Sequence, residues 1–82
     1  MTEYIFRTSL EEADYIVSGD KSFIFRDMKY KLGKGDQLTF QPYKNGKMTR
    51  HPIEKLKFRV TYVSKEEPIE KGFIAIGFRR IA

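Results

Sequence analysis

The chain has 82 residues, which is enough for one domain and too short for two. It is 40% hydrophobic, with seven Phe and five Tyr, so a packed core is expected and the disordered class is excluded. The lack of Cys excludes disulfides, thiolate metal sites and Cys nucleophiles. The formal net charge of +5 favours a polyanionic partner such as RNA, although a mild basic excess also serves solubility alone.

The N-terminal part predicts a strand followed by the main helix. Residues 4–7 form a short apolar run that is typical of a first strand. Thr8 and Glu11 then have the spacing of a capping box, in which two side chains satisfy free amide groups at a helix start. Gly19 is expected to end the helix, because glycine adopts the left-handed conformation at low cost. Between them, apolar residues recur at helical spacing: Leu10, Ala13, Ile16 and Val17.

From Lys21 onward the apolar residues recur with a period of two, which predicts strands. We expect strands at residues 22–26, 28–32, 37–42 and 55–62, and a last strand at 73–78 that is buried on both faces at its centre. The turn at 33–36 contains two glycines, and Asn45-Gly46 is a strong signal for a two-residue hairpin. The pattern therefore predicts an α+β, predominantly β domain over residues 1–82, a small mixed β-barrel of about five to six strands with one main N-terminal helix.

Four segments in order resemble the ASCH domains of the PUA-like superfamily of RNA-associated β-barrels. The run Gly19-Asp20-Lys21-Ser22-Phe23-Ile24-Phe25-Arg26 is similar to the G-x-K-[ST]-x-x-x-R signature of these domains. Residues 35–40, 58–63 and 72–76 resemble the G-D turn with its next strand, the V-T-Y-V strand and the closing strand. The likeness extends from about Tyr4 to Ile81 and is greatest to a compact bacterial and phage branch. It implies a PUA/ASCH-like barrel with a cleft beside the helix.

The resemblance also raises an enzymatic alternative. One branch of the superfamily hydrolyses the acetyl amide of N4-acetylcytidine with a Lys, a Thr and a Glu. Here the Lys corresponds to Lys21, but the Thr falls on Ile24, which cannot attack a carbonyl, and the loop at 64–71 is too short to hold the Glu. Ser22 beside Lys21 would be a substitute nucleophile, although a turn-capping Ser and a solvated Lys are the favoured alternative.

The remaining polar residues do not indicate catalysis. His51 lies beside Pro52 in an expected loop, and a single His makes no metal site. Glu66, Glu67 and Glu70 belong to a loop of mixed charge that is most simply a solvated connection. We therefore predict no catalytic residue, no metal and no cofactor, and a small amidohydrolase acting on a modified nucleoside stays the alternative function.

Two groups of residues are predicted to hold a ligand. The first is a cleft set where the helix ends and the next strand begins, formed by Lys21, Ser22 and Arg26. The Arg26 guanidinium is a planar fork suited to a phosphate or a base edge, and the Lys21 ammonium is a point charge. An ion pair of Arg26 with Asp27, Asp36 or a residue of the helix is the alternative.

The second group is a basic stripe for a nucleic-acid backbone: Lys55, Lys57 and Arg59, extended by Lys47 and Arg50. On one strand the first three would stand about 7 Å apart, close to the phosphate spacing of a nucleic acid. Lysines on exposed strands also block aggregation, and both interpretations stay open. Three tyrosines are candidates for base stacking or for the core: Tyr30, Tyr43 and Tyr62.

We therefore expect a binding module rather than an enzyme, with RNA or a nucleotide-like ligand as its partner. A cytoplasmic location is expected, because Cys is absent and the N-terminal residues lack the pattern of a signal peptide. The oligomeric state is left open, with a monomer favoured. No apolar run approaches the roughly 20 residues that cross a bilayer, so no membrane partner is predicted. A protein-interaction module that uses the sheet edge is a further alternative.

Overall fold

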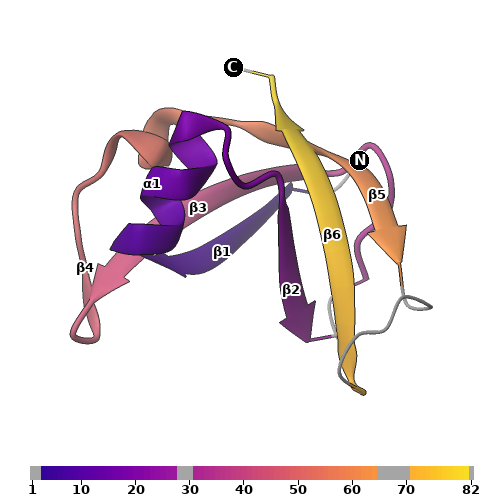
Figure 1. Ribbon diagram of the computed structural model, residues 1–82, viewed down its shortest axis with the longest axis horizontal. Helices are drawn as coiled ribbons and strands as arrows, with labels where there is room; N and C mark the ends of the chain where they lie inside the picture. The colour runs from indigo at the N-terminus through magenta and orange to yellow at the C-terminus, as the bar shows by residue number, and fades with distance from the viewer. Residues whose placement is uncertain (1–2, 28–30, 65–70, 82) are drawn as a thin grey trace.

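The computed structural model describes residues 3–27, 31–64 and 71–81. This part of the chain forms one α-helix, one short 3-10 helix and a six-stranded sheet (Figure 1). In chain order the elements are β1 (Glu3–Ser9), α1 (Leu10–Ser18), β2 (Phe23–Asp27), β3 (Gln37–Lys44), β4 (Lys47–Met48), the 3-10 helix η1 (Pro52–Lys55), β5 (Phe58–Ser64) and β6 (Phe73–Arg80). None of the helices in these ranges is long and apolar enough to cross a membrane.

The sheet is a curled half-barrel with the strand order β1-β3-β5-β6-β2, and β4 pairs with β3. The β1–β3 pair is parallel, and all other pairs are antiparallel. The two edge strands, β1 and β2, bend toward each other, while α1 lies beside β1 and β3 (Figure 1). The expected small, mainly β barrel with one N-terminal helix is confirmed.

The core fills the concave side of the half-barrel, because alternate strand residues point inward. The rings of Phe40, Phe58 and Phe78 pack edge to face or tilted, with centroids 5.3 to 5.5 Å apart. Ala13 and Ile16 of α1 are buried against this core, whereas Val17 is exposed. The predicted helical stripe therefore contributes its central residues to the core and leaves its last residue in solvent.

The helix begins one residue later than predicted. Ser9, not Thr8, is the N-cap, and its Oγ accepts a hydrogen bond from the Glu12 amide at 3.0 Å. The sequence offers two overlapping candidates, Thr8 with Glu11 and Ser9 with Glu12, and Thr8 is instead a buried residue of β1. Gly19 ends the helix as predicted, with φ of 87° and its amide bonded to the Ile16 carbonyl.

Three strand predictions need correction. The strand β3 was expected to end at Pro42 but continues to Lys44. Because β5 pairs only with the first two residues of β3, the missing amide of Pro42 removes no hydrogen bond between these two strands. The strand β5 begins at Phe58, since residues 52–55 form η1. Strand β6 buries one face rather than two, with Ala75 only partly covered between buried neighbours.

Other expectations have mixed outcomes. The Asn45-Gly46 hairpin is confirmed, with φ values of 52° and 79° that fit a two-residue turn. The turn at 33–36 is closed by a bond from the Asp36 amide to the Gly33 carbonyl. Residues 28–30 of the strand expected at 28–32 lie outside the described residues, and Leu32 joins the core without belonging to a strand. Glu66, Glu67 and Glu70 also lie outside the described residues.

Candidate ligand-binding site

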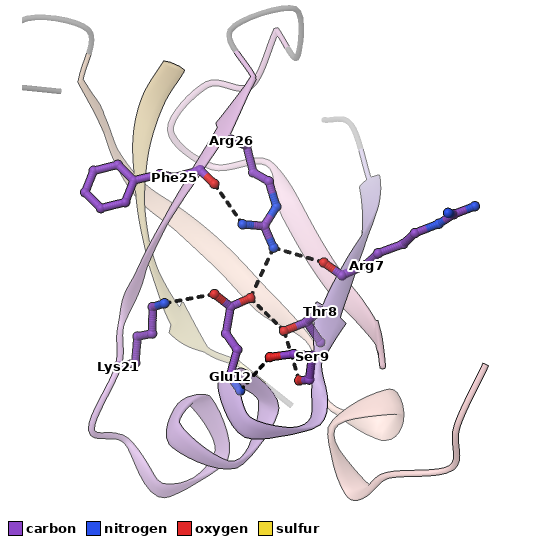
Figure 2. Close-up of polar contacts among 7 residues, drawn as sticks. All are labelled: Arg7, Thr8, Ser9, Glu12, Lys21, Phe25 and Arg26. Carbon is purple, nitrogen blue, oxygen red and sulfur yellow. Dashed lines mark hydrogen bonds and ion pairs between the residues drawn. The ribbon is translucent and has the colours of Figure 1, made fainter. Parts of the chain in front are cut away.

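A cluster around Glu12 connects the start of α1 with β2. The Glu12 carboxylate accepts hydrogen bonds from Thr8 Oγ1 at 2.6 Å, Lys21 Nζ at 2.8 Å and Arg26 Nη2 at 3.2 Å (Figure 2). The capping bond of Ser9 holds the Glu12 backbone at the first turn, which directs the carboxylate toward β2. Two of the three predicted cleft residues, Lys21 and Arg26, therefore meet at a carboxylate that the sequence analysis did not single out.

Arg26 also closes the open side of the half-barrel. Its Nη2 donates to the Arg7 carbonyl of β1 at 3.0 Å, and its Nη1 donates to the Phe25 carbonyl at 2.8 Å (Figure 2). The guanidinium lies 5.4 Å from the centre of the Phe6 ring. Because β1 and β2 are the two edges of the sheet, these contacts replace part of the missing ladder. The ion pair with a helix residue, which was the alternative for Arg26, is the contact that the structure shows.

Glu12 is held in its charged form. Partial burial raises the pKa of the Glu12 carboxyl. Hydrogen bonds from Lys21 and Thr8 and the positive charge of Arg26 lower this pKa, and together they outweigh the effect of burial. The net effect is a pKa below the usual value of Glu. The cluster thus contains the negative charge of Glu12 and the positive charges of Lys21 and Arg26, so its net charge is positive.

A pocket of about 300 Å³ lies next to this cluster, where the segment after α1 runs beside the end of β6. Two backbone hydrogen bonds hold the segments around the pocket together. The Phe78 amide donates to the Ser22 carbonyl, and the Ile81 amide donates to the Lys57 carbonyl. The floor of the pocket is apolar and consists of Ile16, Val17, Leu56, Phe58 and Phe78. Its polar rim consists of Lys21, Ser22, Arg79 and Arg80, beside Gly19.

The pocket includes two predicted cleft residues and two new ones. Lys21 and Ser22 line it, whereas Arg26 faces the Glu12 cluster instead. Arg79 and Arg80 were missed, although a signal was present: two arginines follow the apolar alternation of β6 directly. The described lining residues carry three cationic side chains and no carboxylate. This arrangement fits an anionic ligand with a flat or apolar part.

The geometry does not favour a Ser–Lys nucleophile. Lys21 donates to the Glu12 carboxylate, and a paired ammonium is a poor general base. Ser22 is exposed at the pocket rim, and no hydrogen bond between its side chain and Lys21 is present in the described ranges. Ile24, which occupies the position of the Thr nucleophile in the hydrolase branch, is fully buried in the core.

The basic stripe does not form a regular row. Lys55 ends η1, Lys57 lies between η1 and β5, and only Arg59 belongs to a strand, so the expected 7 Å spacing on one strand is wrong. Lys47 is part of β4, which lies at the opposite end of the molecule from β6 (Figure 1). Arg50 and Lys55 line a shallow second depression with His51 and Glu54. Arg59 instead stands opposite Arg79 of β6.

The three tyrosine candidates and His51 differ in their surroundings. Tyr43 lies under the Arg7 guanidinium, 4.7 Å from ring centre to Cζ, and Tyr62 is half exposed on β5. Tyr30 lies outside the described residues. The His51 side chain, expected at the surface, is only 11% exposed because it caps η1 and bonds to Asp14 at 2.7 Å.

A comparison of the chain with models of known protein families finds no match, and a comparison with curated proteins finds none either. The resemblance to ASCH domains therefore stays a prediction from the sequence motifs.

Proposed function

We propose that this chain is a non-catalytic PUA/ASCH-like module that binds RNA or a nucleotide-like ligand in the pocket between α1, the segment before β2, the start of β5 and the end of β6. The observation that carries the proposal is the pocket itself, in which an apolar floor with two Phe side chains lies beneath a rim of Lys21, Arg79 and Arg80. A nucleotide has the matching parts, a planar base and a charged phosphate. The module is proposed to act as a cytoplasmic monomer.

The rim distributes the charges across two elements. Lys21 approaches from the segment before β2, and Arg79 and Arg80 approach from the end of β6. A phosphate between them would receive charge-assisted hydrogen bonds from both sides. Lys21 is held by Glu12 at 2.8 Å, so its position is fixed before a ligand binds.

Binding is tested by fluorescence anisotropy of a labelled 12-nucleotide RNA, titrated with the protein at low and at moderate salt. The double variant Lys21→Ala/Arg80→Ala should raise the Kd at least about tenfold, because it removes two charged side chains from the rim. The matched control is Lys34→Ala/Lys44→Ala, which removes the same charge from exposed positions away from the pocket.

The control variant should lower affinity only slightly, through net charge, and this loss should vanish at moderate salt. Equal losses in both double variants would contradict the pocket as the binding site. Absence of binding by the wild type at low salt would contradict the nucleic-acid proposal as a whole.

A further inference from the structure

The outer face of β2, β6 and β5 exposes several aromatic rings. Phe23 and Phe25 of β2 are each 48% exposed, Tyr62 of β5 is 50% exposed and Phe73 of β6 is 38% exposed. Phe23 and Phe25 pack edge to face with their ring centres 5.6 Å apart, and the Phe25 ring points away from the Glu12 cluster (Figure 2). Four half-exposed aromatic rings on three neighbouring strands are more than a folded monomer needs at its surface.

The rings on β2 and β5 flank two small residues of β6, Ala75 and Gly77. Phe23 is in register with Gly77 of β6, and Gly77 is in register with Tyr62 of β5. Phe25 is in register with Ala75 in the next row. Since strands in a sheet are about 4.8 Å apart, Phe23 and Tyr62 stand about 10 Å apart across a position without a side chain. We call this surface, formed by Phe23, Phe25, Tyr62, Ala75 and Gly77, the aromatic shelf.

A bulge in β5 is what brings Tyr62 to the shelf. The register of β5 against β6 shifts between Val60 and Tyr62, so Tyr62 faces outward although Val60 faces the core. A Cβ atom on Gly77 would lie 3.3 Å from the Tyr62 Cβ, which is tighter than an ordinary contact. Glycine at position 77 thus lets the start of the Tyr62 side chain lie close against the backbone of β6.

Two arginines end the shelf. Arg59 and Arg79 stand directly opposite each other on β5 and β6, on the same outer face as Gly77 and Tyr62. Like charges in this position repel each other unless an anion lies between them. Within residues 3–27, 31–64 and 71–81, neither guanidinium takes part in an ion pair. At the opposite end of the shelf stands Asp27, in register with Phe73, so the charge changes sign along the shelf.

We propose that the aromatic shelf binds single-stranded nucleic acid, with bases stacked on Phe23, Phe25 and Tyr62 and a phosphate between Arg59 and Arg79. The combination of planar rings with a pair of guanidinium groups fits alternating bases and phosphates better than an apolar protein surface. This inference rests on the proposed function, and Arg79 connects the two sites because it also lines the pocket. A strand that enters the pocket would continue along β6 over the shelf.

Stacking can be measured directly, because the chain contains no Trp. The variant Phe23→Trp provides a single tryptophan on the shelf, which can be excited apart from the tyrosines, and Tyr15→Trp provides one at a similarly exposed position of α1 outside it. Titration with a 12-nucleotide oligouridine should quench the fluorescence of Phe23→Trp saturably and leave that of Tyr15→Trp nearly unchanged. Equal or absent quenching in the two variants would overturn the inference.

Affinity provides the second measurement, by anisotropy of labelled oligouridine. Phe23→Ala/Phe25→Ala and Tyr62→Ala should each raise the Kd about tenfold, Tyr62→Phe should not, and Tyr15→Ala is the control. A hairpin duplex of the same length should bind more weakly than the single strand, because its bases are not free to stack. Duplex binding as tight as that of the single strand would overturn the inference.

The same titrations separate the two sites. A loss of affinity in Lys21→Ala but not in the shelf variants would overturn the shelf and support the pocket. A loss in the shelf variants but not in Lys21→Ala would support the shelf and contradict the pocket. If the shelf substitutions alter only self-association in size-exclusion chromatography, the surface is a contact between copies of the chain and the inference is wrong.

Discussion

At the scale of single residues, Glu12 is the group on which the most polar contacts converge. It joins α1 to β1 through Thr8 and to the segment around β2 through Lys21 and Arg26. Its side chain is 20% exposed, so these hydrogen bonds are only partly screened by water. Glu12 therefore holds the segments around the pocket in place, although it does not line the pocket itself.

The variant Glu12→Gln should therefore destabilise the fold while it favours binding of polyanions. Loss of the charge weakens two ion pairs and should lower the free energy of unfolding by about 2 kcal/mol. The Gln oxygen can still accept a hydrogen bond from Lys21, so Lys21 keeps its position while its charge is no longer neutralised, and the Kd for RNA at low salt should fall. Urea unfolding and anisotropy measure the two effects, and Glu11→Gln, an exposed neighbour in the same helical turn, is the control. A variant as stable as the wild type would show that the cluster has no structural role.

The effect of Glu12→Gln on the free energy of unfolding should depend on pH. The pKa of Glu12 is lower in the folded protein than its usual value of 4.5, so its contribution to stability is present above that value. This contribution is lost as the pH falls through the folded pKa, because the carboxyl must then be protonated. The difference in unfolding free energy between wild type and Glu12→Gln should be full at pH 7 and narrow below pH 4.5. A difference that stays constant down to pH 3 would contradict the ion-pair explanation.

At the scale of elements, local signals were predictable and long-range ones were not. Gly19 and Asn45-Gly46 act within a few residues, so their turns could be placed from the sequence. The bulge near Tyr62 depends on the pairing of β5 with β6, in which the partner of Tyr62 is Gly77, beyond the reach of a local sequence pattern. A period-two pattern continued through this point places Tyr62 on the wrong face.

The candidate site follows the same rule. Lys21 and Ser22 could be placed because they follow the end of the helix directly and match a motif. Arg79 was missed because its place at the pocket depends on the antiparallel alignment of β6 with β2 and β5. The pairing of Arg26 with Glu12 was undetermined, since several acidic residues were equally available in the sequence.

The element η1 gives a further prediction at this scale. The His51 Nδ1 accepts a hydrogen bond from the Ile53 amide, so the ring proton lies on Nε2, which donates to Asp14 of α1. The His51 amide in turn donates to Glu54, which holds the pKa of that carboxyl below its usual value. His51 therefore fixes both the start of η1 and its contact with α1.

The variant His51→Ala should lower the free energy of unfolding by about 1 to 2 kcal/mol, because it removes a cap and a side-chain contact. Thermal unfolding followed by circular dichroism measures this change. The control is Asp14→Asn, whose amide oxygen can still accept from Nε2 and which should have little effect. A loss in Asp14→Asn as large as in His51→Ala would assign the stabilisation to the charge of Asp14 rather than to the cap.

At the scale of the whole molecule, the half-barrel has a gap between its edge strands that a side chain bridges, and an outer face that is exposed. Arg26 bridges its two edge strands, while the outer face of β2, β6 and β5 stays accessible. The pocket and the aromatic shelf meet at Arg79, on the strand that pairs with both β5 and β2. The +5 net charge would bring polyanions to this surface, and the local rims would determine where they bind.

The most direct test of the pocket is a chemical-shift titration of the isotopically labelled protein with a 12-nucleotide RNA. We expect the amide signals of Gly19, Ser22 and Arg79, which lie at the pocket, to shift saturably with one common Kd. The signal of Gly46, in the hairpin at the far end of the sheet, should stay in place. Shifts confined to the hairpin, or no shifts at any RNA concentration, would contradict the assignment of this pocket as a nucleic-acid site.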